Sequence, residues 1–461
     1  MHPVFATSDS QAIPIWFANT GNLAAVATKI GGAAGAFAKA AGFDGRPGQH
    51  LMMPGGGGKL AAVLFGIEGE NDAKKDPLLP GRLAGLLPDG TYRFANAPHD
   101  LRLAALAFAL GTYDFARYRK GGNKKLRLRV PAGVDAKELS AQVEAVTLAR
   151  DLINTPSNDL GPAELEAAAR NVAKTHRAKF ISISGPKLAK GFPLVQAVGG
   201  GSARAPRLID FTWGNPKHPK VTLVGKGVCF DTGGLDIKND AGMLNMKKDM
   251  GGAATALALA HMVMTRKLPV RLRVIIPAVE NSISGTSFRP RDIFRARNGI
   301  TVEIGNTDAE GRLILADALA LADEEKPELI VDFATLTGAA RVALGPDLPP
   351  FFTDDDQFAL DLSRHGAAEA DPIWRLPLWR PYEAMLDSKV ADTNNVGGGM
   401  GGAITAALFL RKFVGRARTW VHLDIFAWTP AAKPGRPEGG ECMSARALYA
   451  LLSDRYGKKQ K

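Results

Sequence analysis

The feature that most constrains the fold is a regular alternation of strand and helix patterns in the second half of the chain. Short apolar runs, typical of buried strands, are separated by segments whose apolar residues recur at helical spacing. Strands joined in this way by helices form a mostly parallel sheet flanked by helices. We expect strands at 221–224, 270–277, 301–304, 329–334 and 420–426, and helices at 251–265 and 311–323.

The first half of the 461-residue chain has a different pattern. It predicts a buried strand at 60–65, a helix at 100–111 and a long helix at 136–152. A polar segment with a proline follows at 154–158 and is typical of a domain boundary. We therefore expect two domains, one at residues 1–150 and a larger one at 151–461.

Composition excludes several classes of protein. Two cysteines, Cys229 and Cys442, cannot form a disulfide framework, and they favour a reducing, cytoplasmic compartment. The first residues lack a basic region followed by an apolar core, so we expect no secretory signal. The longest apolar runs, 103–110 and 403–410, are much shorter than the roughly 18–20 residues of a membrane span.

The formal net charge of +12 is unusual, and part of it is concentrated in the segment 117–129. Seven basic side chains surround a Gly-Gly turn there, and Leu126 and Leu128 alternate with arginines as in a half-exposed strand. Such an excess fits a nucleic-acid partner, an anionic surface, or a role in solubility alone.

Three loops in the second half are rich in acids and glycines. They span 225–238, 245–252 and 306–312. The first and third follow expected strands, and the second leads into an expected helix, so all three belong at the end of the sheet where ligands bind. Four carboxylates at one such end repel one another unless cations neutralise them, and two divalent metal ions would do so. These carboxylates are Asp231, Asp249, Asp308 and Glu310.

Each loop is weak evidence when it is taken alone. An isolated acidic residue in a loop is usually a solvated charge or a helix cap, and Gly251-Gly252 before a helix fits close packing as well as anion binding. The chain has no Cys-x-x-Cys, His-Glu-x-x-His or Gly-x-Ser-x-Gly motif. An oxygen-rich set with few histidines suits Mg²⁺, Mn²⁺ or Zn²⁺.

At these loops the sequence resembles the leucyl aminopeptidase (cytosol aminopeptidase) family of dimetal peptidases. The stretch Asn-Thr-Asp-Ala-Glu-Gly-Arg-Leu at 306–313 is the complete signature of that family. The resemblance runs from about residue 151 to the C-terminus and extends weakly to 111–118. Further matches lie at 277–281, 289–292, 334–339, 374–378, 391–395 and 422–425.

The resemblance implies roles for seven charged residues of the three loops. Lys238 would stabilise the oxyanion of the tetrahedral intermediate. Arg312 would hold a bicarbonate that acts as general base, although a salt bridge to the ligand carboxylates is the structural alternative. The metal ligands it implies are Lys226, Asp231, Asp249, Asp308 and Glu310, with Lys226 in its neutral form.

Family positions at the substrate match Met246, Asn306, Thr335, Leu336 and Gly338. Met246 would line an apolar pocket for the N-terminal side chain, with a place in the hydrophobic core as the alternative. Thr335 and Leu336 would offer backbone groups to the peptide. Phe426 and Trp428 stand where smaller residues are frequent in the family, which changes the expected shape of the pocket, and Thr232 and Asp236 replace usual serines.

The predicted protein is a metal-dependent aminopeptidase that releases N-terminal residues, with apolar ones such as leucine expected. The resemblance implies two divalent ions (Zn²⁺ or Mn²⁺, with Mg²⁺ as a third candidate), bicarbonate at Arg312, a cytoplasmic homo-hexamer and a smaller N-terminal α/β domain. One rival is a basic nucleic-acid-binding protein on a peptidase scaffold, based on 117–129. A weaker rival is a dimetal phosphatase, which would use more histidines.

Overall fold

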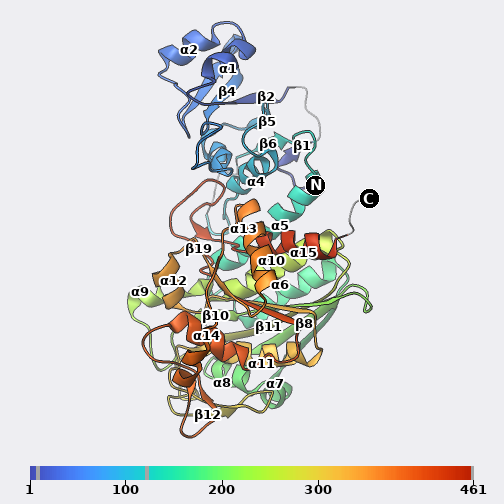
Figure 1. Ribbon diagram of the computed structural model, residues 1–461, viewed down its shortest axis with the longest axis vertical. Coiled ribbons are helices and arrows are strands. Elements are labelled where there is room, and N and C mark those ends of the chain that lie inside the picture. Colours follow the sequence, from blue (N-terminus) through green and yellow to red (C-terminus); the bar gives the residue numbers. More distant parts are fainter. Residues whose placement is uncertain (7–10, 120–123, 458–461) are drawn as a thin grey trace. The chain divides into compact units, whose positions relative to one another are not determined.

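The computed structural model describes residues 1–6, 11–119 and 124–457. The chain forms two compact units. The first contains residues 1–147 together with 431–438, and the second contains 148–430 and 439–461. Figure 1 shows the elements of both units.

The first unit contains a mixed six-stranded sheet. Its strands are β1 (Phe5–Ala6), β2 (Ile13–Ala18), β3 (His50–Pro54), β4 (Leu60–Gly66), β5 (Gly90–Phe94) and β6 (Leu126–Arg129). They lie in the order β1-β6-β5-β2-β4-β3, and every neighbouring pair is parallel except β3 and β4. The helices are α1 (Leu23–Ile30), α2 (Ala34–Ala40), α3 (Leu83–Leu86), α4 (Leu101–Gly111) and the start of α5 (Ala136–Asn154).

The strand predicted at 60–65 and the helix predicted at 100–111 are confirmed as β4 and α4. Asp100 caps α4, because its carboxylate accepts a hydrogen bond of 2.8 Å from the backbone of Leu103. Every residue from 103 to 110 is buried, which explains why this apolar run belongs to a core helix rather than to a membrane span. None of the helices in the described part of the chain combines the length and apolar character needed to cross a bilayer.

The second unit contains a nine-stranded sheet, which is the predicted mostly parallel sheet. Its strands are β7 (Lys179–Ser184), β8 (Arg207–Trp213), β9 (Lys220–Gly225), β10 (Gly227–Asp231), β11 (Arg271–Asn281), β14 (Leu329–Ala334), β15 (Pro350–Phe352), β16 (Trp374–Arg375) and β18 (Thr419–Asp424). The order is β16-β15-β18-β14-β9-β11-β8-β7, and β10 pairs with β11. The central strands β18, β14, β9 and β11 are parallel. Their buried residues, which face both sides, explain the unbroken apolar runs in the sequence.

Helices cover both faces of this sheet (Figure 1). One face is covered by α6 (Pro162–Thr175), α10 (Gly251–Thr265), α13 (Asp356–Ala368) and α15 (Ala445–Tyr456). The other is covered by α8 (Pro193–Gly199), α11 (Glu310–Glu324) and α14 (Gly402–Arg411), with α7 (Gly185–Gly191) beside α8. The smaller elements are α9 (Asp240–Met243), η3 (Met246–Met250), β12 (Ile293–Arg295), β13 (Thr301–Glu303), α12 (Gly338–Leu344), η4 (Arg380–Leu386), β17 (Thr393–Asn394), β19 (Trp428–Thr429) and β20 (Gly439–Gly440).

The sheet differs from the prediction in several places. The strand expected at 301–304 forms as β13 (Thr301–Glu303), but it belongs to a separate three-stranded sheet with β12 and β17. The antiparallel pair β15–β18 was not expected. Residues 227–231 were expected within a loop but form β10, because β11 continues to Asn281 and offers them a partner beyond the end of β9. The antiparallel pairs β7–β8 and β8–β11 at one edge were not expected. All of these corrections depend on pairing between distant segments, which a local pattern does not contain.

Candidate active site

Neighbouring parallel strands place three functional residues side by side. Lys226 directly follows β9, Thr335 directly follows β14, and Asp424 ends β18. The Lys226 backbone N–H donates to Phe333 O at 2.9 Å, and its side-chain amine donates to Thr335 O at 3.0 Å. The site is therefore built at the carboxyl ends of the strands, as expected for this kind of sheet.

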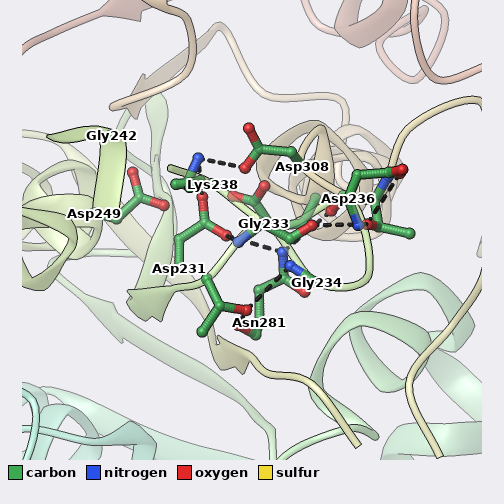
Figure 2. Close-up of polar contacts among 12 residues, drawn as sticks. Asp231, Gly233, Gly234, Asp236, Lys238, Gly242, Asp249, Asn281 and Asp308 are labelled. Atoms are coloured by element: carbon green, nitrogen blue, oxygen red, sulfur yellow. Dashed lines mark hydrogen bonds and ion pairs between the residues drawn. The ribbon is translucent and has the colours of Figure 1, made fainter. Parts of the chain in front are cut away.

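The end of β10 positions Asp231. Its Oδ1 accepts hydrogen bonds of 2.9 Å from the Asn281 carboxamide and from the Gly233 backbone. Gly233 and Gly234 then turn the chain with φ values of +88° and +67°, a conformation that favours glycine. The turn is closed by a 3.0 Å bond from the Lys238 N–H to Thr232 O. Lys238 thereby returns to Asp231, and Figure 2 shows its amine between the side chains of Asp231 and Asp308.

The signature loop between β13 and α11 supplies the next two carboxylates. Asp308 lies in the loop, and Glu310 is the first residue of α11. The Asn306 side chain accepts the Asp308 N–H at 2.7 Å, so Asn306 shapes the loop. Asn395 holds the same loop from outside: its Oδ1 accepts the Gly305 N–H at 2.7 Å and its Nδ2 donates to Asn306 O at 2.8 Å.

All five residues predicted as metal ligands lie together. Carboxylate oxygens of Asp231, Asp308 and Glu310 lie within 4.8 Å of one another. Lys226 connects this group to Asp249, because its amine lies 2.8 Å from Asp249 Oδ2 and 2.9 Å from Glu310 Oε1. Thr335 donates to the other Asp249 oxygen at 2.7 Å, which fixes the orientation of that carboxylate.

The electrostatics of the group indicate a need for cations. Burial, together with the charge of Asp231, raises the pKa of Glu310 to about 8 and that of Asp308 to about 6. Burial opposes the charged form of Lys226, but Asp249 and Glu310 outweigh it and raise the pKa of its amine. The carboxylates are thus packed more closely than their joint ionisation allows unless positive charge is added.

The donor set also fits divalent metal ions. Asp249 Oδ2 and Glu310 Oε1 are buried and accept no hydrogen bond of good geometry, although the Lys226 amine is close to both. Lone pairs that are buried in this way suit a metal ion, and carboxylate oxygens with one amine suit the hard and borderline ions.

Gly311 of the signature has a steric role. A Cβ at this position would lie 2.4 Å from Cε and 2.7 Å from Nζ of Lys226. A larger residue at the first turn of α11 would therefore displace the Lys226 side chain from its position between Asp249 and Glu310.

A cavity of about 240 Å³ opens onto the group. Its walls include Lys238 and Arg312, the two residues predicted to be catalytic. Met246 is half-buried and lines the cavity, so it does not belong to the closed core. All residues predicted to contact the substrate line the cavity, namely Met246, Asn306, Thr335, Leu336 and Gly338.

Arg312 has the geometry of an anion-binding group. Its Nη1 donates to Asn395 O at 2.8 Å, while its buried Nε has no hydrogen-bond partner. Among the described residues it forms no ion pair, so the alternative of a salt bridge to the ligand carboxylates is not observed. Burial lowers the pKa of Arg312 to about 10, which still leaves the guanidinium charged at neutral pH.

Several residues of the site were not among the predicted ones. Asn281, Asn395 and Asp424 position the loops; Asp424 accepts the Leu336 and Thr337 N–H groups at 2.9 and 3.1 Å. All three fall in the stretches 277–281, 391–395 and 422–425 that carry the family resemblance, which is the signal that could have identified them. Lys248 and Arg341 also line the cavity. Burial lowers the pKa of Lys248 to about 8, and its amine is still mostly protonated at pH 7.

The rival predictions find less support in this structure. In the basic segment, Arg119 pairs with Asp114 at 2.6 Å, and Lys124 donates to Gly85 O at 2.7 Å, so these side chains bind their own unit. The strand predicted around Leu126 is confirmed as β6. Residues 120–123 of the segment lie outside the described residues. As for the phosphatase, no histidine is among the described residues that line the cavity.

Comparisons with known proteins agree with this site. The model of the cytosol aminopeptidase family catalytic domain matches residues 147–449, and that of the M17 aminopeptidase N-terminal domain matches 13–131. A probable cytosol aminopeptidase from Roseiflexus castenholzii is 41% identical over 365 residues, which cover 75% of this chain and 74% of the relative. The crystal structure of a cytosol aminopeptidase from Coxiella burnetii has a TM-score of 0.93 and 46% identity, covering 99% of this chain and 100% of that one.

A further solved structure is the bottromycin maturation enzyme BotP in complex with Mn, with a TM-score of 0.86, 33% identity, and coverage of 97% of this chain and 100% of that chain. The family models together span most of the chain and include every residue of the site described above. The chain therefore belongs to the cytosol aminopeptidase family and is a peptidase of the aminopeptidase class.

Proposed function

We propose that this chain removes N-terminal residues from peptides with two divalent ions held at the carboxylate group. The observation that carries the proposal is the approach of Asp231, Asp308 and Glu310 oxygens to within 4.8 Å of one another, beside a cavity that Asp231 and Asp308 line. Zn²⁺ or Mn²⁺ would be held by Lys226, Asp231, Asp249, Asp308 and Glu310, with Mg²⁺ as a third candidate. When bound, such ions lower the pKa of water and polarise a carbonyl group.

Lys238 is assigned to the developing oxyanion. Burial opposes its charged form, but Asp231 and Glu310 outweigh burial and raise the pKa of its amine. The ammonium group is therefore held protonated, 2.9 Å from Asp231, at the wall of the cavity. A preorganised cation in this position stabilises negative charge on the scissile carbonyl oxygen.

Arg312 is assigned to a bicarbonate that accepts and returns a proton. Its unpartnered Nε, in a cavity wall, supports this role, because a guanidinium binds a planar oxyanion through parallel N–H groups. Asn395 fixes the guanidinium by accepting from Nη1.

The substrate residues and the assembly complete the proposal. Met246 would contact the N-terminal side chain, with leucine as a fitting example, while Asn306, Thr335, Leu336 and Gly338 would line the path of the peptide. The family resemblance also supports a cytoplasmic homo-hexamer.

Leucine p-nitroanilide with Mn²⁺ or Zn²⁺ tests the aminopeptidase assignment. We expect the purified chain to release p-nitroaniline from this substrate and not from its N-acetylated form, because the free amine is needed at the site. The absorbance of p-nitroaniline measures both reactions. Equal cleavage of the acetylated compound, or no cleavage of either with any divalent ion, would contradict the proposal.

A further inference from the structure

Two cationic side chains in the cavity wall form no ion pair with any of the described residues. Lys248 is only 2% exposed and Arg341 is half-buried, and both line the cavity that opens onto the carboxylate group. Among the described residues, neither side chain forms an ion pair or donates a hydrogen bond. A buried cation without such a partner is costly, so its retention in a wall points to a ligand.

The nearby carboxylates are already engaged. Asp249 is bound by Thr335 at one oxygen and faces the Lys226 amine at 2.8 Å with the other. Asp424 accepts two backbone N–H groups at Oδ1 and the Thr337 hydroxyl, at 2.6 Å, at Oδ2. Both carboxylates are therefore already bound by other groups, and neither forms an ion pair with Lys248 or Arg341 among the described contacts.

Phe426 holds both cationic groups in place. The Lys248 amine lies 5.1 Å from the centre of the Phe426 ring, and the Arg341 guanidinium carbon lies 4.8 Å from the same centre. Cation–π contacts of this length favour both positions without neutralising either charge.

The cations lie beside residues assigned to the substrate. Lys248 belongs to the same short helix, η3, as Met246 and precedes Asp249. Arg341 follows Gly338 by one turn of α12, and its Nη2 lies 3.6 Å from the point that a Cβ on Gly338 would occupy. An anion bound here would therefore belong to the N-terminal residue of the substrate, which precedes the scissile bond.

We propose that Lys248 and Arg341 form a subsite for the side-chain carboxylate of an N-terminal glutamate or aspartate. The inference rests on the aminopeptidase function proposed above and names its substrate class. The methylene groups of glutamate would pack against Met246, while the carboxylate would receive hydrogen bonds from the two cations. The C-terminal carboxylate of a dipeptide would also bind two cations. It belongs, however, to the leaving amino acid and not to the N-terminal residue, whose side chain would contact Met246.

Matched anilide substrates test the subsite in the metal-loaded enzyme. Glutamine has the shape of glutamate without its charge, so we expect kcat/KM for glutamate p-nitroanilide to exceed that for glutamine p-nitroanilide by about tenfold to a hundredfold. The ratio should fall toward one in Lys248→Met and in Arg341→Gln, and Arg341→Lys should retain part of it. Lys187→Met, a substitution at an exposed lysine of α7, is the matched control and should keep the full ratio.

The outcomes separate the two proposals. A wild-type enzyme that cleaves leucine anilide but does not favour glutamate over glutamine overturns the subsite and leaves the aminopeptidase assignment in place. Failure to cleave any anilide overturns that assignment itself. The last comparison is between leucyl-alanine and leucyl-alanine amide, which differ in the charge at the C-terminus. If the wild-type enzyme prefers the free acid, loses this preference in Arg341→Gln and shows no preference for glutamate, the cations bind a C-terminal carboxylate. That result would contradict the inference. Because the glutamate-to-glutamine ratio of the wild-type enzyme can overturn the subsite by itself, a variant that does not fold leaves that test intact.

Discussion

Replacement of Glu310 by glutamine is expected to lower kcat/KM for leucine p-nitroanilide by about a thousandfold or more, which corresponds to roughly 4 kcal/mol of transition-state stabilisation. Glutamine keeps the shape of the side chain but loses its negative charge and one of its two acceptor oxygens. Glu310 is buried, at 1% exposure, and its Oε1 faces the Lys226 amine at 2.9 Å. Water therefore has little access to replace the lost ligand.

Steady-state kinetics at saturating metal measures the effect. Glu324→Gln is the matched control, because Glu324 ends the same helix, is exposed and pairs with Arg297 away from the cavity. Thermal unfolding of both variants shows whether the fold is retained. A Glu310→Gln protein that folds and keeps more than about a tenth of the wild-type kcat/KM would mean that Glu310 is no metal ligand.

Replacement of Gly252 by alanine is expected to destabilise the second unit by about 3 kcal/mol or more. A Cβ on Gly252 would lie 2.1 Å from Phe333 O and 2.9 Å from the Lys226 backbone nitrogen. Both atoms belong to backbone that is fixed by the Lys226 N–H to Phe333 O bond of 2.9 Å and by the Ala253 N–H to Lys226 O bond, also 2.9 Å. Helix α10 must therefore shift away from the sheet, with the loss of at least one of these bonds.

Urea denaturation followed by circular dichroism measures this change as a lower midpoint at unchanged slope. The control is Gly285→Ala, because a Cβ there meets no atom within 4 Å. The Gly252 variant should also lose activity, since Lys226 would move with its backbone. Equal stability of the two variants would show that α10 does not approach the sheet as closely as described.

Central elements of the second unit follow from local sequence. The helix predicted at 251–265 and the strand predicted at 329–334 have these bounds in the structure, because both are mostly apolar and buried on nearly all sides. Strand β8 was not predicted, and it carries a buried acid, Asp210. Its charge is matched by Arg273 of β11 at 2.6 Å, a partner 63 residues away that no local window contains.

In the active site, too, the sequence predicted some residues and missed others. The signature at 306–313 and the spacing of the other loops identified the residues that the structure brings together, from Lys226 to Arg312. The sequence did not show, however, in which direction a side chain points. Lys248 and Arg341 read as ordinary basic residues in the sequence, and only the fold places them against one aromatic ring in the cavity wall.

The central claim is that two divalent ions at this carboxylate group make the chain an aminopeptidase. It is tested most directly by stripping the protein with a chelator and measuring leucine p-nitroanilide hydrolysis while Mn²⁺ is added back in known amounts. We expect no activity in the metal-free protein and a rise that levels off at two ions per chain. Full activity in protein shown to be metal-free, or no activity at any level of Mn²⁺ or Zn²⁺, would contradict it.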